Sequence, residues 1–186
     1  MKPFVKLNNA KGENVAGIFS RVYRRGPNTY LGLLSRGTQE NVVLHFPKEA
    51  YLYEMGERDF LEYSNKTQVS LKPVIGKMLA ILPYKVSGIS IELPPRVKQG
   101  AALCWKAILK AESGQVGDHV FNVTVTAPNG EKSKSWSGNE LAMKGILDRE
   151  WNIAFNELPG KWAITVRDSV SGKEAQASFI VTESED

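Results

Sequence analysis

The C-terminal stretch 158–181 constrains the fold of this chain more than any other segment. It reads LPGKWAITVRDSVSGKEAQASFIV and contains two runs in which apolar residues take every second position. These residues are Trp162, Ile164 and Val166 in the first run and Ala175, Ala177, Phe179 and Val181 in the second. A period of two places one set on a buried face of a strand. Because Asp168, Ser171 and Gly172 are turn formers between the runs, we expect an antiparallel hairpin of the kind that closes a β-sandwich.

Short strands separated by turns recur through residues 1–86. The expected strands are 18–23, 29–34, 42–46, 50–54, 60–63, 68–71 and 78–82. The segment RRGPN (24–28) is expected to turn between the first two strands. Pro47 is expected to end the third, since proline cannot donate a hydrogen bond to a ladder. Seven or so strands at this spacing predict a sandwich or barrel.

Residues 87–186 repeat the pattern. Clean alternation over 103–109 and 121–125 predicts strands, and Pro128–Asn129–Gly130 predicts a turn. Segment 138–148 (GNELAMKGILD) is the only plausible helix. Six or seven strands in this length match an immunoglobulin-like sandwich. The sequence therefore predicts an all-β fold of two tandem antiparallel β-sandwiches, with domains at 1–86 and 87–186 and the second domain immunoglobulin-like.

Charge and composition limit the classes of partner. Of the 186 residues, 42% are hydrophobic and 24% charged, and no apolar run reaches the length of a membrane span. Residues 1–88 carry 13 Lys and Arg against 7 Asp and Glu, while 89–186 carry 11 against 13. The change of sign favours two domains, and it is too mild to indicate nucleic-acid binding. The N-terminus lacks the apolar run of a secretory signal, so we expect either a cytoplasmic protein or a piece of a longer chain.

The usual signals of catalysis and metal binding are absent from the sequence. His45 and His119 lie inside strand patterns and are expected to be ordinary strand histidines. No Cys-x-x-Cys, His-x-x-x-His, P-loop or Gly-x-Ser-x-Gly motif occurs, so neither a cofactor nor a metal is expected. The single cysteine, Cys104, adjoins Trp105 in a strand and is expected to be an inert packed thiol.

Glycoside hydrolysis uses two carboxylates, and the sequence offers two candidate pairs. They are Glu54 with Glu57 and Asp148 with Glu150. Both pairs fall in turns or at strand starts, where solvated carboxylates are common. We therefore expect no catalytic residue and no enzymatic activity.

Two features have the chemistry of binding sites. Trp136 lies among Ser, Lys and Gly in KSKSWSGN (132–139) and is the candidate ligand-binding residue, since an exposed indole can stack on a sugar or anchor an interface. The alternative is that it caps the core or the seam between the domains. RVYRRG (21–26), with Tyr30 nearby, mixes aromatic and basic residues, which together can stack on and pair with nucleic acid. The outward polar face of a hairpin predicts the same composition and is the favoured interpretation.

Several motifs resemble the C-terminal β-sandwich region of bacterial glycoside-hydrolase-like proteins. They are YLYEMGERDFLEYSNKTQVSLKP (51–73) and LPYKVSGISIELPPRVKQGAAL (82–103). A Pro-x-Gly turn at 128–130 and a Gly-x-Trp…Val-Arg-Asp…Gly pattern at 160–172 resemble the immunoglobulin-like or macroglobulin-like sandwich that often follows. The resemblance covers the chain from about Tyr23 onward.

The resemblance implies a non-catalytic accessory region. In such proteins the catalytic acids lie in an upstream barrel domain of the same longer protein, which would be the partner of this chain. It further implies a periplasmic or secreted location and possible glycan contact. The alternative is an immunoglobulin-type protein-binding or adhesion module unrelated to sugars. Exposed aromatic residues on a concave face favour the first, and a flat apolar patch favours the second.

Overall fold

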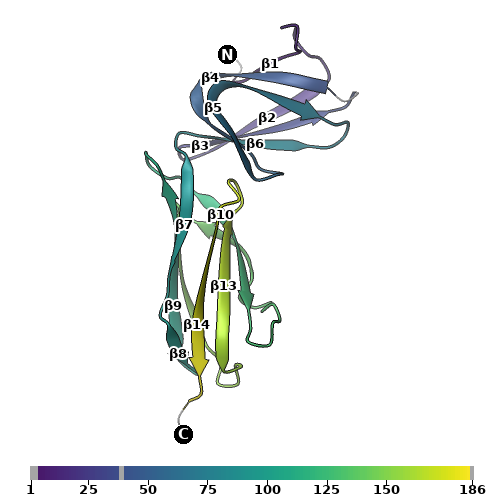
Figure 1. The fold of residues 1–186 in the computed structure, drawn as a ribbon. Coiled ribbons are helices and arrows are strands. Elements are labelled where there is room, and N and C mark those ends of the chain that lie inside the picture. Colours follow the sequence, from purple (N-terminus) through teal and green to yellow (C-terminus); the bar gives the residue numbers. More distant parts are fainter. Residues whose placement is uncertain (1–3, 38–39, 185–186) are drawn as a thin grey trace. The chain divides into compact units, whose positions relative to one another are not determined.

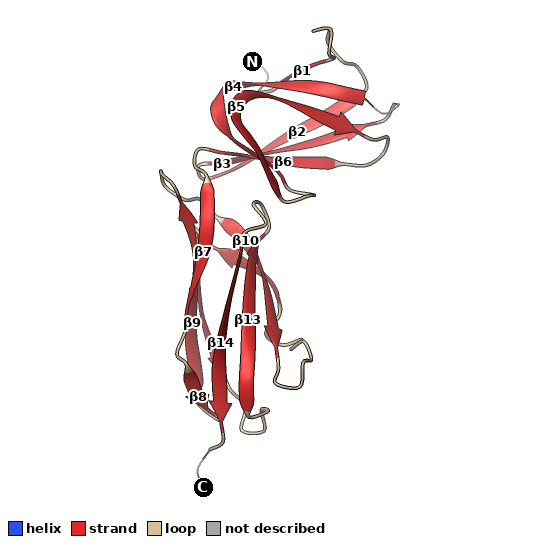
Figure 2. Ribbon diagram, viewed as in Figure 1, coloured by secondary structure: helices blue, strands red, loops and turns tan. Residues whose placement is uncertain are grey.

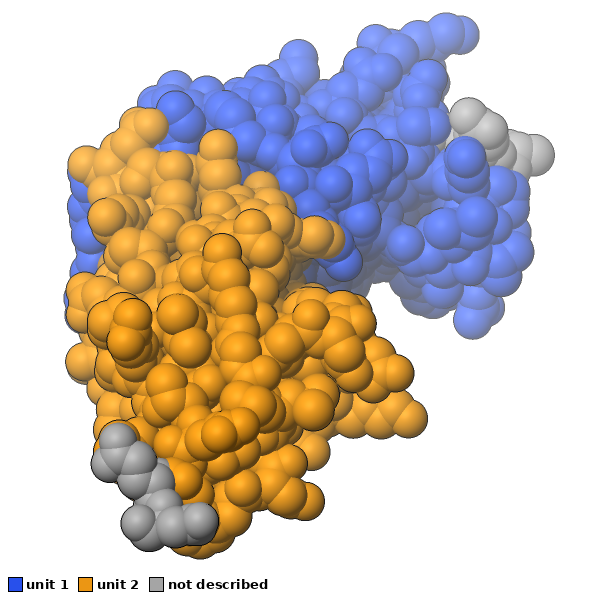
Figure 3. Space-filling model, turned by 60° about the horizontal axis from the view of Figure 1, so that its bottom comes forward, with its two compact units in different colours: residues 1–85, 113–115 blue, residues 86–112, 116–186 orange. Residues whose placement is uncertain are grey.

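A computed structural model describes residues 4–37 and 40–184, and these fold entirely as strands and connecting turns, with no helix among them (Figures 1 and 2). The all-β prediction is therefore confirmed. The described part of the chain contains no helix that could cross a membrane. Two compact units are present, residues 1–85 with 113–115 and residues 86–112 with 116–186 (Figure 3).

The first unit is a six-stranded sheet. Its strands are β1 (Lys6–Asn8), β2 (Ile18–Arg25), β3 (Asn28–Ser35), β4 (Glu40–Glu54), β5 (Asp59–Leu71) and β6 (Lys77–Leu82). The order is β1-β4-β6-β3-β2, and β5 also pairs with β4. All the pairs are antiparallel. The strands β4 and β5 are long and curved (Figure 1), so one sheet supplies both sides of a single core.

The core of this unit follows from alternation along the strands. Leu31 and Leu33 of β3, Leu44 and Leu52 of β4, and Leu79 of β6 are almost completely buried. They belong to one cluster that also takes residues from β5. Along each strand, large apolar residues take every second position, as burial of one sheet face requires.

Pro47 does not end a strand as expected. The strand β4 continues through it to Glu54, and the register with β5 shifts between His45 and Ala50. His45 pairs with Lys66 and Ala50 pairs with Ser64, so an advance of five residues along β4 matches two along β5. The residues of β4 between these pairs therefore bulge out of the ladder. A bulge tolerates proline because the bulged residues need no ladder partner. The expected strands 60–63 and 68–71 are likewise parts of the single strand β5.

The second unit consists of two sheets. Its strands are β7 (Val86–Glu92), β8 (Arg96–Lys98), β9 (Ala102–Ala111), β10 (His119–Thr126), β11 (Gly138–Ala142), β12 (Ile146–Asn152), β13 (Gly160–Asp168) and β14 (Glu174–Thr182). One sheet has the order β11-β10-β13-β14-β8 and the other β12-β9-β7. All the pairs are antiparallel except β14 with β8.

The predicted C-terminal hairpin is present. Trp162, Ile164 and Val166 of β13 are buried, as are Phe179 and Val181 of β14. Trp162 pairs directly with Phe179. The alternating residues of β9 and β10 are buried as well, so the two sheets enclose an apolar core in the manner of a sandwich.

The helix expected at 138–148 is wrong. The segment forms two strands, β11 in one sheet and β12 in the other, and a tight turn at 143–145 joins them. Lys144 and Gly145 both have positive φ, at 51° and 75°. A left-handed backbone at two successive residues ends a helix, and it makes a close turn between strands.

Candidate functional site

All four tryptophans of the chain lie in one cluster within the second unit. Trp136 stacks on Trp151, with ring centroids 5.3 Å apart and planes 3° from parallel. The ring centroids of Trp136 and Trp162 are 5.1 Å apart, and the two ring planes are inclined at 58°. Trp105 in turn lies 4.8 Å from Trp151. Because Trp105 and Trp151 belong to one sheet and Trp162 to the other, the rings of the cluster bridge the two sheets.

Trp136 is half-buried in this cluster. One face of its ring is covered by Trp151, so that face is not free to stack on a sugar. Trp162 is held by a 2.9 Å hydrogen bond from its indole N–H to the Leu158 carbonyl, and it is buried. The arrangement makes Trp136 a cap over the core of the second unit, with part of its ring left open to solvent.

A pocket of about 570 Å³ opens in the first unit, at the bulge of β4. Its walls are aromatic rings and prolines, with Lys48 and Glu49 at the bulge. The apolar lining includes Phe4, Pro27, Phe46, Pro47, Tyr51, Tyr63 and Pro83. This volume is within the range of pockets that hold small organic ligands.

Tyr51 and Tyr63 form the aromatic wall of this pocket. They are opposite each other in the β4–β5 ladder, and their ring centroids are 4.6 Å apart. Tyr63 remains 54% exposed. A ring held in place by a neighbour and open on its other side is suited to stack on the apolar face of a sugar, and the phenol hydroxyls and the charged groups at the bulge can exchange hydrogen bonds with its hydroxyls.

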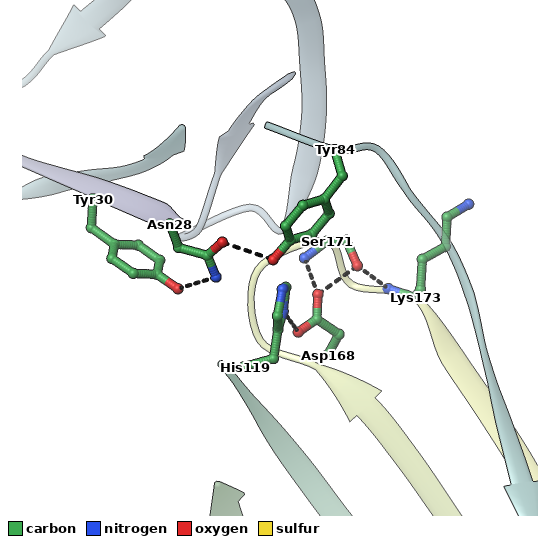
Figure 4. Close-up of polar contacts among 7 residues, drawn as sticks. All are labelled: Asn28, Tyr30, Tyr84, His119, Asp168, Ser171 and Lys173. Atoms are coloured by element: carbon green, nitrogen blue, oxygen red, sulfur yellow. Dashed lines mark hydrogen bonds and ion pairs between the residues drawn. The ribbon is translucent and has the colours of Figure 1, made fainter. Parts of the chain in front are cut away.

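His119, Asp168 and Ser171 make a buried polar cluster in the second unit (Figure 4). The Nδ1 of His119 lies 2.7 Å from Oδ1 of Asp168. The other carboxylate oxygen accepts hydrogen bonds from the Ser171 hydroxyl at 2.6 Å and from the Ser171 amide at 2.8 Å. The cluster fixes the β13–β14 turn to the start of β10.

These three residue types also form catalytic triads, and the geometry here differs from one. In a triad the serine hydroxyl bonds to the histidine, which takes its proton. Here the Ser171 hydroxyl donates to Asp168 instead. Burial raises the pKa of Asp168, but the hydrogen bond and charge of His119 and the two bonds from Ser171 outweigh this and lower the pKa below its ordinary value. The cluster therefore holds an ionised carboxylate as a structural anchor.

A second buried polar group lies in the first unit (Figure 4). The Tyr84 hydroxyl donates a 2.8 Å hydrogen bond to Oδ1 of Asn28, whose amide nitrogen donates to the Tyr30 hydroxyl at 3.3 Å. Asn28 and Tyr84 are completely buried. These bonds join the start of β3 to the segment that follows β6.

The candidate catalytic carboxylates form ion pairs or lie exposed to solvent. Glu54 forms an ion pair with Lys77, with 2.7 Å between Oε2 and Nζ, while Glu57 is exposed in the β4–β5 turn. Asp148 pairs with Lys106 at 3.0 Å. Within the described ranges, no group of three His, Cys, Asp or Glu side chains is placed to hold a metal ion.

Cys104 is exposed, so the expectation of a packed thiol is wrong. It alternates in β9 with the buried Leu103 and Trp105, which turns its side chain to the outer face of the sheet. Its Sγ lies 3.7 Å from a carboxylate oxygen of Glu150. Desolvation by neighbouring groups and the charge of Glu150 raise the pKa of the Cys104 thiol, which leaves it protonated and unreactive at neutral pH.

Comparison with known proteins gives only distant structural likeness. No protein-family model and no curated protein matches the chain. A β-glucosidase from Listeria innocua aligns over 66% of this chain and 18% of its own, at 17% identity and a TM-score of 0.39. The same enzyme in complex with isofagomine aligns with a TM-score of 0.37 and 17% identity, over 66% of this chain and 19% of its own. A Salmonella alpha-2-macroglobulin mutant, Y1175G, aligns over 94% of this chain and 13% of its own, at 10% identity and a TM-score of 0.42.

The chain thus spans less than a fifth of the length of these structures. At such TM-scores the matches support no argument about this chain, and its function is argued from its own residues.

Proposed function

We propose that this chain is a non-catalytic accessory region of a carbohydrate-active, glycoside-hydrolase-like protein, and that its first unit contacts glycan. The observation that carries the proposal is the aromatic pocket at the β4 bulge, where Tyr51 and Tyr63 present a preformed wall. Sugar rings bind such walls by stacking their C–H faces on the aromatic ring, and pocket size limits the contact to one or two sugar units.

The sequence motifs that resemble accessory sandwiches support the same proposal. Gly160, Trp162 and the Val166–Asp168 segment of that pattern build β13 and its turn, so they serve the fold of the second unit. Under this proposal the second unit is a rigid spacer, the catalytic domain is elsewhere in the same protein, and the chain functions in the periplasm or outside the cell.

The proposal is tested by glycan binding to single-residue variants. We expect the wild-type chain to be retarded in native gels that contain a soluble β-glucan or another neutral polysaccharide. Tyr63→Ala should weaken binding roughly tenfold, because truncation of a central aromatic anchor commonly removes more than 1 kcal/mol. Phe155→Ala is the matched control, since Phe155 is an exposed aromatic of the second unit, 77% accessible and outside the pocket.

A Trp136→Ala variant separates the two aromatic candidates. If the pocket is the glycan site, this variant binds like the wild type after correction for any loss of folded protein. Loss of binding in Trp136→Ala with full binding in Tyr63→Ala would move the site to the tryptophan cluster. Failure of the wild type to bind any polysaccharide of a broad panel would contradict glycan contact altogether.

A further inference from the structure

The strand β2 is the end strand of its sheet in the described part of the chain. It pairs with β3 over eight residues without a register shift, from Ile18 with Ser35 to Arg25 with Asn28. The connection is the two-residue turn Gly26–Pro27, and the pair that flanks such a turn exchanges both hydrogen bonds. The hydrogen-bonded positions then alternate along the strand.

This alternation leaves a regular row of backbone groups at the free edge. Ile18, Ser20, Val22 and Arg24 are the positions whose N–H and C=O groups point away from β3. A straight, unbulged edge of this length is a template on which another extended chain can add a strand.

An apolar hollow adjoins this edge on the outer face of the sheet. Phe19 and Tyr23 are 52% and 46% exposed, and Met78 of β6 is 40% exposed. Gly32 lies between Arg21 and Met78 in the ladder and forms part of the floor of the hollow, where a Cβ would lie 3.7 Å from the Met78 sulfur and 4.0 Å from the Tyr23 ring. The hollow has a volume of about 540 Å³ and a mainly apolar lining. It can receive alternate side chains of an added strand.

The charges along the edge select the partner. Residues 18–36 contain four arginines and no Asp or Glu. Arg21 lies over the ring of Tyr23 at 5.4 Å, Arg24 over Phe4 at 5.1 Å and Arg36 over Phe19 at 4.4 Å. Among the described side chains, these three cations pack against aromatic rings and have no carboxylate partner, and they remain available to an acidic chain.

The same charges disfavour a second copy of this chain. Pairing of two β2 edges would bring arginines against arginines, and like charges on facing strands are destabilising. An acidic strand has the opposite effect, since its carboxylates would meet Arg24.

We propose that the β2 edge and the adjoining hollow form a docking site for an extended acidic peptide segment of another protein, which adds to the sheet as a strand. This site uses β2, β3 and β6 and is separate from the pocket at the β4 bulge, so it stands whether or not the first unit binds glycan.

The probe is a synthetic peptide in which Glu alternates with Val and Leu, with a matched peptide that has Lys in place of Glu. Binding is measured by NMR titration and by amide hydrogen exchange of the full chain. We expect the acidic peptide to bind and to slow exchange at Ser20 and Val22, and the lysine peptide to bind at least tenfold more weakly. Equal binding of the two peptides, or protection confined to other strands, would overturn the proposal.

Ser20→Pro tests the backbone contribution. It removes a donor that points away from β3, so β2 and β3 keep their mutual hydrogen bonds. We expect roughly tenfold weaker binding of the acidic peptide, while the matched control Ser20→Ala binds normally. Unchanged binding in Ser20→Pro would overturn the proposal.

Arg24→Glu provides a second test that does not depend on tolerance of proline. Arg24 is on the face of β2 opposite the hollow, where the Glu side chains of the probe point when its Val and Leu enter the hollow. The variant should lose the acidic peptide and gain the lysine peptide. If neither preference changes, the edge does not select by charge. Sedimentation of the chain without peptide tests for self-association through the same edge. A wild-type dimer that becomes a monomer in Ser20→Pro would identify the occupant as a second copy and contradict the proposal.

Discussion

At the scale of single residues, the second unit depends on a few large or buried side chains that bridge its sheets. Trp162 is buried among Trp136, Phe179 and the rest of the core, and its indole N–H is bonded to Leu158. The indole N–H of Trp105 is also buried, yet it has no partner among the described residues. The tryptophan cluster is therefore held by ring packing more than by hydrogen bonds.

Trp162→Ala should destabilise the second unit by about 3–5 kcal/mol, because it removes a buried aromatic side chain and leaves a cavity. Trp136→Ala is the matched comparison and should cost less, since Trp136 is only half-buried. Chemical denaturation followed by tryptophan fluorescence measures both. Near-wild-type stability of Trp162→Ala would show that the ring does not support the core.

Asp168 gives the second unit a defined response to acid. Its pKa is lower in the folded protein than the ordinary value of 3.8, so the unfolded chain takes up the proton first as the pH falls. Its contribution to stability is full above this ordinary value and is lost as the pH falls towards the lower folded pKa.

We therefore expect Asp168→Asn to lower the unfolding free energy by about 1–3 kcal/mol at neutral pH, because the bonds from His119 and Ser171 are weakened. The difference from the wild type should shrink as the pH falls below about 4. Urea denaturation at a series of pH values measures this. A difference that stays constant from pH 7 to pH 3 would contradict an ionised Asp168 in the folded state.

At the scale of elements, turns with special backbone geometry decide where strands end. Gly145 lies in the β11–β12 turn at a φ of 75°, and a Cβ there would lie 2.6 Å from Cγ1 of Val116. Gly130, in the turn after β10, has a similar φ of 85° but open space around it. The two glycines share a backbone requirement and differ in packing.

Gly145→Ala should therefore destabilise the second unit more than Gly130→Ala. Both substitutions place a side chain at positive φ, at a cost of about 1 kcal/mol, and only Gly145→Ala adds a collision with Val116. Thermal unfolding of the two variants gives the comparison. Equal losses of thermal stability would show that Val116 moves aside freely.

Local pattern explains what could be predicted from the sequence. Alternation in β13 and β14 identified their buried faces, because one strand face is a local property. The same pattern could not distinguish the two short strands β11 and β12, which belong to different sheets, from a short helix. Cys104 was placed in a strand correctly but on the wrong face, although its alternation with Leu103 and Trp105 contained the signal.

The functional features depend on contacts between residues of different strands and turns, which the local sequence pattern does not specify. The aromatic pocket arises from the register shift at Pro47, which brings Tyr51 and Tyr63 together across a bulge. The pairing of His119 with Asp168 joins residues 49 positions apart. Trp136 was recognised as exceptional from its loop, but its stacking on Trp151 depends on the tertiary fold.

At the scale of the whole molecule, the chain divides into two compact units. The backbone first passes from the first unit to the second between Lys85 and Val86, and the short segment 113–115 also belongs to the first unit. We expect limited proteolysis to release two fragments, with the first cleavage near residues 84–88. Mass spectrometry of the early fragments identifies the site. Initial cleavage deep within either sheet, with no cleavage near residues 84–88, would contradict two independent domains.

The central claim is that the chain binds glycan without converting it. The direct measurement incubates the purified chain with labelled oligosaccharides and aryl glycosides and records both binding and product formation. The account predicts saturable binding that Tyr63→Ala weakens, with every oligosaccharide recovered at its original length. Turnover by the purified chain, abolished by substitution of a single carboxylate such as Glu54→Gln, would contradict it.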